Sequence, residues 1–154
     1  MRLSYRDGFL GFSLLLAVSA FAQEKKIKPQ DLPPAVQKTV VEQTKGGTVR
    51  GFNEETENGR TTYELEMIMN GHTKDVQMDS AGAKHEVEEQ VEMGALSPEV
   101  RKRLLAQAGK GKIMKVESIR KKDKVVAYEA QISTGGKKSK LQVGPEGQPL
   151  DHEE

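Results

Sequence analysis

Carboxylates are the most numerous reactive side chains in this sequence of 154 residues, which contains 23 Asp and Glu and no cysteine. Two carboxylates held in one cleft with separated pKa values could carry out acid–base hydrolysis. The glutamates at 54–57 and 86–89, however, lie beside a turn and in a polar segment, where a solvated surface accounts for them. Cysteine nucleophiles and disulfides are excluded, and no G-x-S-x-G motif is present. We therefore expect a protein that is not an enzyme.

Carboxylates can also bind a metal ion. Asp75, Asp79 and Glu86 could lie near one loop, and calcium accepts carboxylate oxygens. Residues 79–82 nevertheless lack the D-x-D-x-D-G pattern of a calcium loop, and their spacing is that of a turn. The histidines lie in a turn, a charged segment and the C-terminal tail, and we expect all three to be exposed (His72, His85 and His152). The sequence predicts no metal and no cofactor.

Basic side chains are concentrated in two short runs, 120–122 and 137–140. Such runs can mark a nucleic-acid surface, but only three aromatic residues lie beyond residue 22 for base stacking. Solvated hairpin tips are favoured as the explanation of these basic runs, and we expect no nucleic-acid partner.

The charges are also divided along the chain, because 31–94 has 6 basic and 13 acidic residues, whereas 95–150 has 13 basic and 5 acidic. This division could hold two halves of one molecule together or favour head-to-tail self-association.

The N-terminal sequence predicts export. A signal peptide at 1–22 has its three parts in order: basic residues, an apolar stretch and an A-x-A cleavage site (Arg2 and Arg6, 9–20, 20–22). The apolar stretch is too short for a typical transmembrane helix, although an uncleaved N-terminal anchor remains an alternative. A polar leader follows at 23–30. We expect a periplasmic or secreted protein with no stable membrane anchor after cleavage.

The strongest internal pattern is self-similarity. LPPAVQK at 32–38 returns as LSPEVRK at 96–102, an offset of 64 residues. Further along, Tyr63-Glu64 matches Tyr128-Glu129 at an offset of 65. Ordered matches with one inserted residue predict a duplication. We therefore divide the chain into a first repeat at 31–94, a second repeat at 95–150 and an acidic tail at 151–154.

Each repeat is expected to open with a short helix. Ser97 is a good N-cap, Pro98 suits the first helical position, and Glu99 complements the helix dipole. Val100 and Leu104 then fall on one apolar face. The first helix repeats this pattern from its own proline. The glycines that follow each helix predict its end (Gly46 and Gly47 for the first, Gly109 or Gly111 for the second).

The rest of each repeat alternates with period two, which predicts antiparallel strands joined by hairpins. Tyr63 and Leu65 share a buried strand face, whereas Thr62 and Glu64 take the other face. Residues 84–92 fit either a fourth strand or a short helix. Four methionines are expected to fill part of the core (Met67, Met69, Met78 and Met114). The predicted fold class is α+β: a tandem repeat of a helix plus three to four antiparallel strands, in two layers, with both helices on one face of the sheet.

The LPxxV opening, the glycine break and the strands Tyr63–Glu66 and Tyr128–Gln131 resemble the PepSY and PepSY-like families of exported bacterial proteins. The resemblance covers roughly 31–150. It implies tandem modules of a helix and an antiparallel sheet, with a fold similar to that of a β-lactamase inhibitor protein. It also implies an inhibitory or regulatory role toward proteases, and it brings no catalytic or ligand residues.

The function predicted from these observations is an exported, non-enzymatic binding module. It would contact another periplasmic or secreted protein, such as a protease or other cell-envelope protein, through an exposed sheet face or edge. The candidate binding residues lie on the polar strand face: Glu64, Glu66, Glu129 and Gln131. The alternative is a periplasmic protein that binds small ligands or cations.

Overall fold

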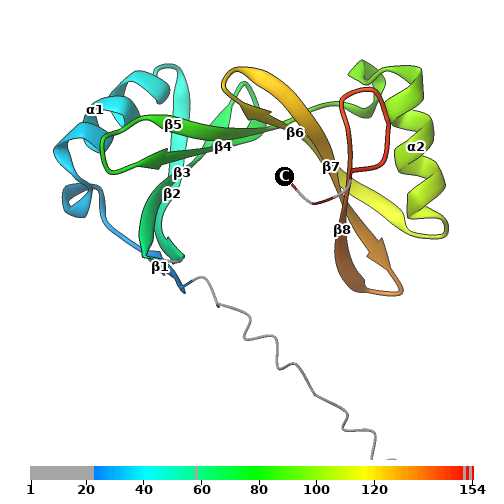
Figure 1. Cartoon of the computed structure of the whole chain (residues 1–154), viewed down its shortest axis with the longest axis horizontal. Coiled ribbons are helices and arrows are strands. Elements are labelled where there is room, and N and C mark those ends of the chain that lie inside the picture. Colours follow the sequence, from blue (N-terminus) through cyan, green and yellow to red (C-terminus); the bar gives the residue numbers. More distant parts are fainter. Residues whose placement is uncertain (1–22, 58, 151, 153) are drawn as a thin grey trace, which may run out of the picture.

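The computed structural model describes residues 23–57, 59–150, 152 and 154, so the predicted signal peptide at 1–22 lies outside the described residues. The described chain forms one eight-stranded antiparallel sheet, in which every strand pairs with its neighbours in sequence (Figure 1). The strands are β1 Gln23–Lys26, β2 Gly47–Glu57, β3 Arg60–Met69, β4 His72–Asp79, β5 Lys84–Gln90, β6 Lys112–Lys121, β7 Lys124–Thr134 and β8 Lys137–Val143. The α-helices are α1 Pro34–Gln43 and α2 Pro98–Ala108, and each follows a short 3-10 turn, Pro29–Asp31 or Met93–Ala95.

The predicted fold class, an α+β tandem repeat, is wrong. The part of the chain that the structure describes is mostly β, with about 21% of those residues in helices. The physical reason lies at the centre of the sheet, where β5 pairs with β6 from Glu86 opposite Lys121 to Gln90 opposite Glu117. The backbone hydrogen bonding of the sheet is therefore continuous, and no free strand edge separates the two halves.

The start of α2 agrees with the prediction from the sequence. The Ser97 hydroxyl accepts a hydrogen bond from the backbone N–H of Val100 at 3.2 Å, and Pro98 occupies the first turn. Gly109, with a φ of 56°, follows the last residue of the helix. The first helix differs, because its N-cap residue, Pro33, makes no side-chain capping bond. Each helix is short and depends on packing against the sheet for its stability.

Two apolar clusters form the core, and one helix covers each. Near α1, Val36 packs with side chains of β2, β3 and β4, and near α2, Val100 and Leu104 pack with side chains of β6, β7 and β8. The cross-strand register puts Leu65 opposite Val76, and Tyr128 opposite Val143. Both helices therefore lie over the same sheet face, one near each end (Figure 1).

Two local predictions are settled by the strand register. The ambiguous segment 84–92 forms strand β5, so the strand alternative is correct. Met114, in contrast, does not fill the core, since 57% of it is exposed. A bulge between Ile113 and Lys115 shifts the register of β6 there and leaves Met114 outside the pairing. Within the described residues, neither helix is long and apolar enough to cross a bilayer.

Candidate functional site

The sheet face turned away from both helices, called the open face below, carries polar and charged side chains. Residues directly opposite in an antiparallel pair project to the same face. Glu66 lies opposite Asp75, Asp75 lies opposite Glu88, and Glu88 lies opposite Ile119. One row across the middle of the open face therefore contains three carboxylates on three neighbouring strands.

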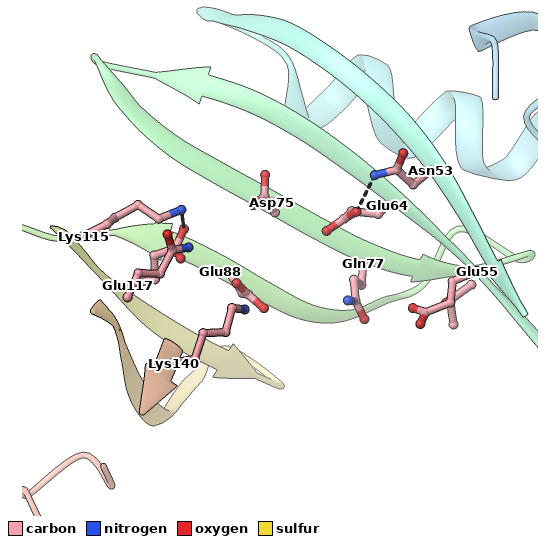
Figure 2. A pocket seen from close by; sticks show the side chains of 11 residues that line it. Asn53, Glu55, Glu64, Asp75, Gln77, Glu88, Lys115, Glu117 and Lys140 are labelled. Atoms are coloured by element: carbon pink, nitrogen blue, oxygen red, sulfur yellow. Dashed lines mark hydrogen bonds and ion pairs between the residues drawn. The ribbon is translucent and has the colours of Figure 1, made fainter. Parts of the chain in front are cut away.

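A cleft of about 290 Å³ lies in the open face (Figure 2). Every strand from β2 to β8 contributes to its lining. The acidic part of the lining comes mainly from β2 to β5, with Glu55, Glu64 and Asp75 among its residues. The basic part comes from β6 and β8, as Lys115 and Lys140. The cleft is thus formed only when the two halves of the sheet are joined.

At the centre of the cleft, Asp75, Glu88 and Glu117 bring carboxylate oxygens within 4.8 Å of one another. Glu117 is almost completely buried, at 1% exposure. Its Oε1 is 2.6 Å from Lys115 Nζ and accepts a hydrogen bond from the Thr73 hydroxyl at 3.3 Å. Within the described residues, Asp75 and Glu88 form no ion pair within 4.0 Å. The cluster therefore holds more negative charge than its own lysines neutralise.

This arrangement raises the pKa values of two carboxyl groups. Burial raises the pKa of Asp75 to about 6, and the negative charges of Glu64 and Glu117 add to the effect. Burial also raises the pKa of Glu88 to about 7, with further contributions from Glu117 and Glu129. Lysine charges oppose both shifts without cancelling them. Near neutral pH the cleft therefore holds protons that a cationic group could replace.

The flanks of the cleft are fixed by side-chain hydrogen bonds. Asn53 is 2% exposed and donates to Glu64 at 2.8 Å and to Glu66 at 3.0 Å. On the other flank, Glu129 forms an ion pair with Lys140 at 2.7 Å. Gln142 also donates to Glu129, at 3.0 Å. These contacts hold the carboxylates in fixed positions, and groups that are fixed in advance bind a ligand at a lower entropic cost.

All four residues predicted from the sequence belong to the open face. Glu64 and Gln131 line the cleft directly. Glu66 lies opposite Asp75, and Glu129 lies opposite Glu117. Glu129 is buried, at 4% exposure, where the sequence suggested a water-facing side chain. Whether these four residues bind a partner stays a prediction.

Several residues of the cleft were missed by sequence reasoning. Glu88 lies in the segment whose strand or helix character was left open, and only the strand alternative brings it to the open face opposite Asp75. Lys115 and Glu117 follow the bulge in β6, which shifts the alternation of that strand. The only available signal was the run of glutamates at 86–89, which alternates between the two faces once β5 is a strand.

The residues considered for a metal site are separated in the structure. Asp79 Oδ1 accepts hydrogen bonds from the backbone N–H groups of Ala81 and Ala83, both at 2.9 Å, as expected for a turn. Glu86 pairs with Lys121 at 3.4 Å. Of the original candidates only Asp75 joins the carboxylate cluster, whose oxygen ligands would suit a hard cation. The expectation of exposed histidines holds for His85 and His152, whereas His72 is half-buried.

Comparison with known proteins identifies the fold. No protein-family model matches this sequence, and no curated protein matches it. A DUF2874 family protein from Bacteroides ovatus is similar in structure, with a TM-score of 0.59, 19% identity, and coverage of 78% of this chain and 85% of that one. A predicted periplasmic protein from Bacteroides eggerthii gives a TM-score of 0.62 at 15% identity, with coverage of 77% and 86%. A BLIP-like protein from Bacteroides fragilis gives 0.54 at 18% identity, with coverage of 78% and 83%. This chain therefore has a fold similar to that of a BLIP-like protein.

Proposed function

We propose that this chain is an exported, non-enzymatic binding module of the periplasm whose open face holds a basic segment of a protein partner. The observation that carries the proposal is the pair Asp75 and Glu88. These residues lie directly opposite each other on the neighbouring strands β4 and β5, and they form no ion pair within the described residues. A lysine or arginine side chain of a partner would supply the missing positive charge. Charge-assisted hydrogen bonds to carboxylates are among the strongest available to such a cleft.

The role of the module would be inhibition or regulation of a protease or another cell-envelope protein. Three observations support this role. The sequence resembles the PepSY and PepSY-like families, the fold is similar to that of a BLIP-like protein, and a structural neighbour is predicted to be periplasmic. The periplasmic location also agrees with the export signal predicted at 1–22.

The proposal is tested by comparing capture from a periplasmic extract by three forms of the protein. Glu64→Lys reverses a charge in the cleft, and Glu42→Lys reverses one on the exposed surface of α1. We expect a protein band that is captured by the wild type and by Glu42→Lys and is lost with Glu64→Lys. Equal capture by all three forms would count against a partner in the cleft.

A second candidate function is cation binding, and the cluster of Asp75, Glu88 and Glu117 favours it. Hard cations such as calcium take several oxygen ligands, which three carboxylates within 4.8 Å could share. Titration calorimetry with calcium chloride, together with thermal unfolding, separates the two candidates. A ligand of the native state must raise its stability, so an unchanged Tm in excess calcium would remove the second candidate.

A further inference from the structure

The charges of the open face are divided between its two halves. On β2 to β5 the register brings eight acidic residues to this face (Glu55, Glu57, Glu64, Glu66, Asp75, Asp79, Glu86 and Glu88). One basic residue, Arg60 at the start of β3, lies on the same face opposite Glu57, and Arg50 borders the acidic residues from a bulge in β2. On β6 to β8 the same register brings six lysines to the face (Lys112, Lys115, Lys121, Lys124, Lys138 and Lys140). The two acidic residues there, Glu117 and Glu129, each pair with a lysine. We call these regions the acidic half and the basic half.

We infer that the open face pairs with the open face of a second copy of this chain, the acidic half of one copy lying against the basic half of the other. The open face is also the surface that the proposed function assigns to a protein partner. Self-pairing would regulate binding of that partner, because an open face covered by a second copy is not accessible. It does not require that the partner of the proposed function exists.

Two-fold symmetry makes this pairing self-consistent. In a two-fold dimer the same surface is used by both copies, so each contact occurs twice. An axis lying in the interface, at right angles to the line from the acidic to the basic half, places each acidic half over a basic half. An axis along that line would instead place like charges together, which is unfavourable. The charge division therefore selects one of the two arrangements.

The structure already shows a carboxylate seated on the basic half. Glu154 places its Oε2 3.1 Å from Lys121 Nζ. Its backbone N–H donates to Gln142 Oε1 at 2.8 Å, which brings the end of the described chain back over β8 and β6 (Figure 1). Lys140 also keeps 58% of its side chain exposed despite its pair with Glu129. The basic half can therefore accept further acidic groups from outside.

The β8 edge of the sheet is less suited to self-association than the open face. β8 is an edge strand, and its residues Lys137, Lys138 and Lys140 are all exposed. Lysines on an edge oppose pairing with another strand. Exposed ion pairs contribute little affinity each and are screened by salt, so the dimer should be weak and sensitive to ionic strength.

Charge reversal with complementary mixing tests the inference. Glu55→Lys/Glu88→Lys reverses two charges of the acidic half, and Lys112→Glu/Lys138→Glu reverses two charges of the basic half. Both variants leave the hydrogen bonds of Asn53 and the ion pair of Lys140 intact. Sedimentation equilibrium measures the average mass of each variant and of their equimolar mixture. Circular dichroism confirms that both variants are folded.

In about 20 mM NaCl, we expect the average mass of the wild type to rise with protein concentration. In about 500 mM NaCl, we expect the dissociation constant of the dimer to rise at least about tenfold. Each reversed variant alone should remain monomeric, because both of its contacts would join a reversed half to an unchanged one. Their mixture should form a heterodimer, because one contact joins two unchanged halves and the other joins the two reversed halves. The control Glu42→Lys/Lys102→Glu, which changes exposed helix residues, should behave as the wild type does.

A wild type that stays monomeric up to about 1 mM in low salt would overturn the inference. A mixture of the reversed variants that stays monomeric while the wild type dimerises would also overturn it. These outcomes are independent of the proposed function. A monomeric protein that still loses captured partner on Glu64→Lys would refute self-pairing and leave the binding module intact.

Discussion

At the scale of single residues, the open face breaks a rule that most sheets follow. Like charges directly opposite on neighbouring strands are destabilising, yet Asp75 and Glu88 are paired in this way. Burial and the surrounding carboxylates raise the pKa of each group, to about 6 and about 7. Within the described residues neither group forms an ion pair that would relieve this repulsion, and such a local conflict is expected where a surface serves a function.

The raised pKa of Glu88 makes stability depend on pH in a definite direction. Between its ordinary pKa of 4.5 and its folded pKa of about 7, the folded state binds more protons than the unfolded state. The contribution of Glu88 to stability is therefore present below pH 4.5 and is lost as the pH rises toward 7. Glu88→Gln removes this loss. After discounting for solvent exposure, we expect a gain of about 1 kcal/mol at pH 8 and almost none at pH 4.5.

Urea unfolding at the two pH values measures this effect. Glu89→Gln is the matched control, because Glu89 is the next residue on β5 and lies opposite Lys74 rather than opposite a carboxylate. The control should show no gain at pH 8. Equal changes for both variants would mean that the carboxylate cluster does not raise the pKa of Glu88.

At the scale of elements, turns and caps anchor the helices to the sheet. The turn between β4 and β5 lies against α1, and the Thr39 hydroxyl donates to the Gly82 carbonyl at 2.8 Å. Gly82 has a φ of 75°, and a Cβ at this position would lie 2.6 Å from the carbonyl oxygen of Ala35. Both the backbone conformation and the close approach of the helix therefore require glycine.

Replacement of Gly82 separates these two requirements. Gly59 has a nearly identical φ of 76°, but a Cβ there would meet nothing within 4 Å. We expect Gly59→Ala to cost about 1 kcal/mol, from backbone strain alone, and Gly82→Ala to cost about 3 kcal/mol, because the added methyl group pushes α1 from the sheet. Thermal unfolding of both variants provides the measurement. Equal costs would show that the turn does not hold α1.

The two helix starts differ in capping. Ser97→Ala removes the hydrogen bond to the Val100 N–H and should cost about 1 kcal/mol. Pro33→Ala at the start of α1 removes no side-chain cap and should change stability less. Denaturant unfolding of the two variants compares these costs directly. A larger loss for Pro33→Ala would mean that the rigidity of proline matters more than the cap.

At the scale of the whole molecule, the two halves are joined through β5 and β6. Lys121 on β6 lies at this junction, where it pairs with Glu86 on β5 and with Glu154. Glu154 therefore contacts a lysine that belongs both to the junction of β5 and β6 and to the basic half of the open face. A second copy would compete with Glu154 for Lys121.

Removal of residues 151–154 tests this competition. The shortened chain loses the partly exposed ion pair between Glu154 and Lys121 and the hydrogen bond from Glu154 to Gln142, so its Tm should fall by no more than a few degrees. Its self-association in low salt should tighten by about two- to threefold, because Lys121 loses one of its two acidic partners. Sedimentation equilibrium of both forms gives the comparison. Weaker self-association of the shortened chain would show that the segment forms part of the interface.

Local rules in the sequence predicted many of the elements. The proline and serine at the start of α2, the alternation of Tyr63 and Leu65, and the turn at 79–82 all depend on near neighbours in the chain. The side of the sheet occupied by the four candidate residues also followed from alternation. Met114 was misplaced because a bulge changes the alternation, and a bulge leaves little signal in a single strand.

What the sequence determined by itself was the local chemistry: where helices begin, which strand face is polar, and how charge is divided along the chain. Only the tertiary structure decided that β5 joins β6, which made one sheet from what resembled two units. The same pairing brought Asp75, Glu88 and Glu117 together from three strands. The physical reason is that register between strands depends on contacts distant in sequence, so a carboxylate cluster built across strands has no local pattern that predicts it.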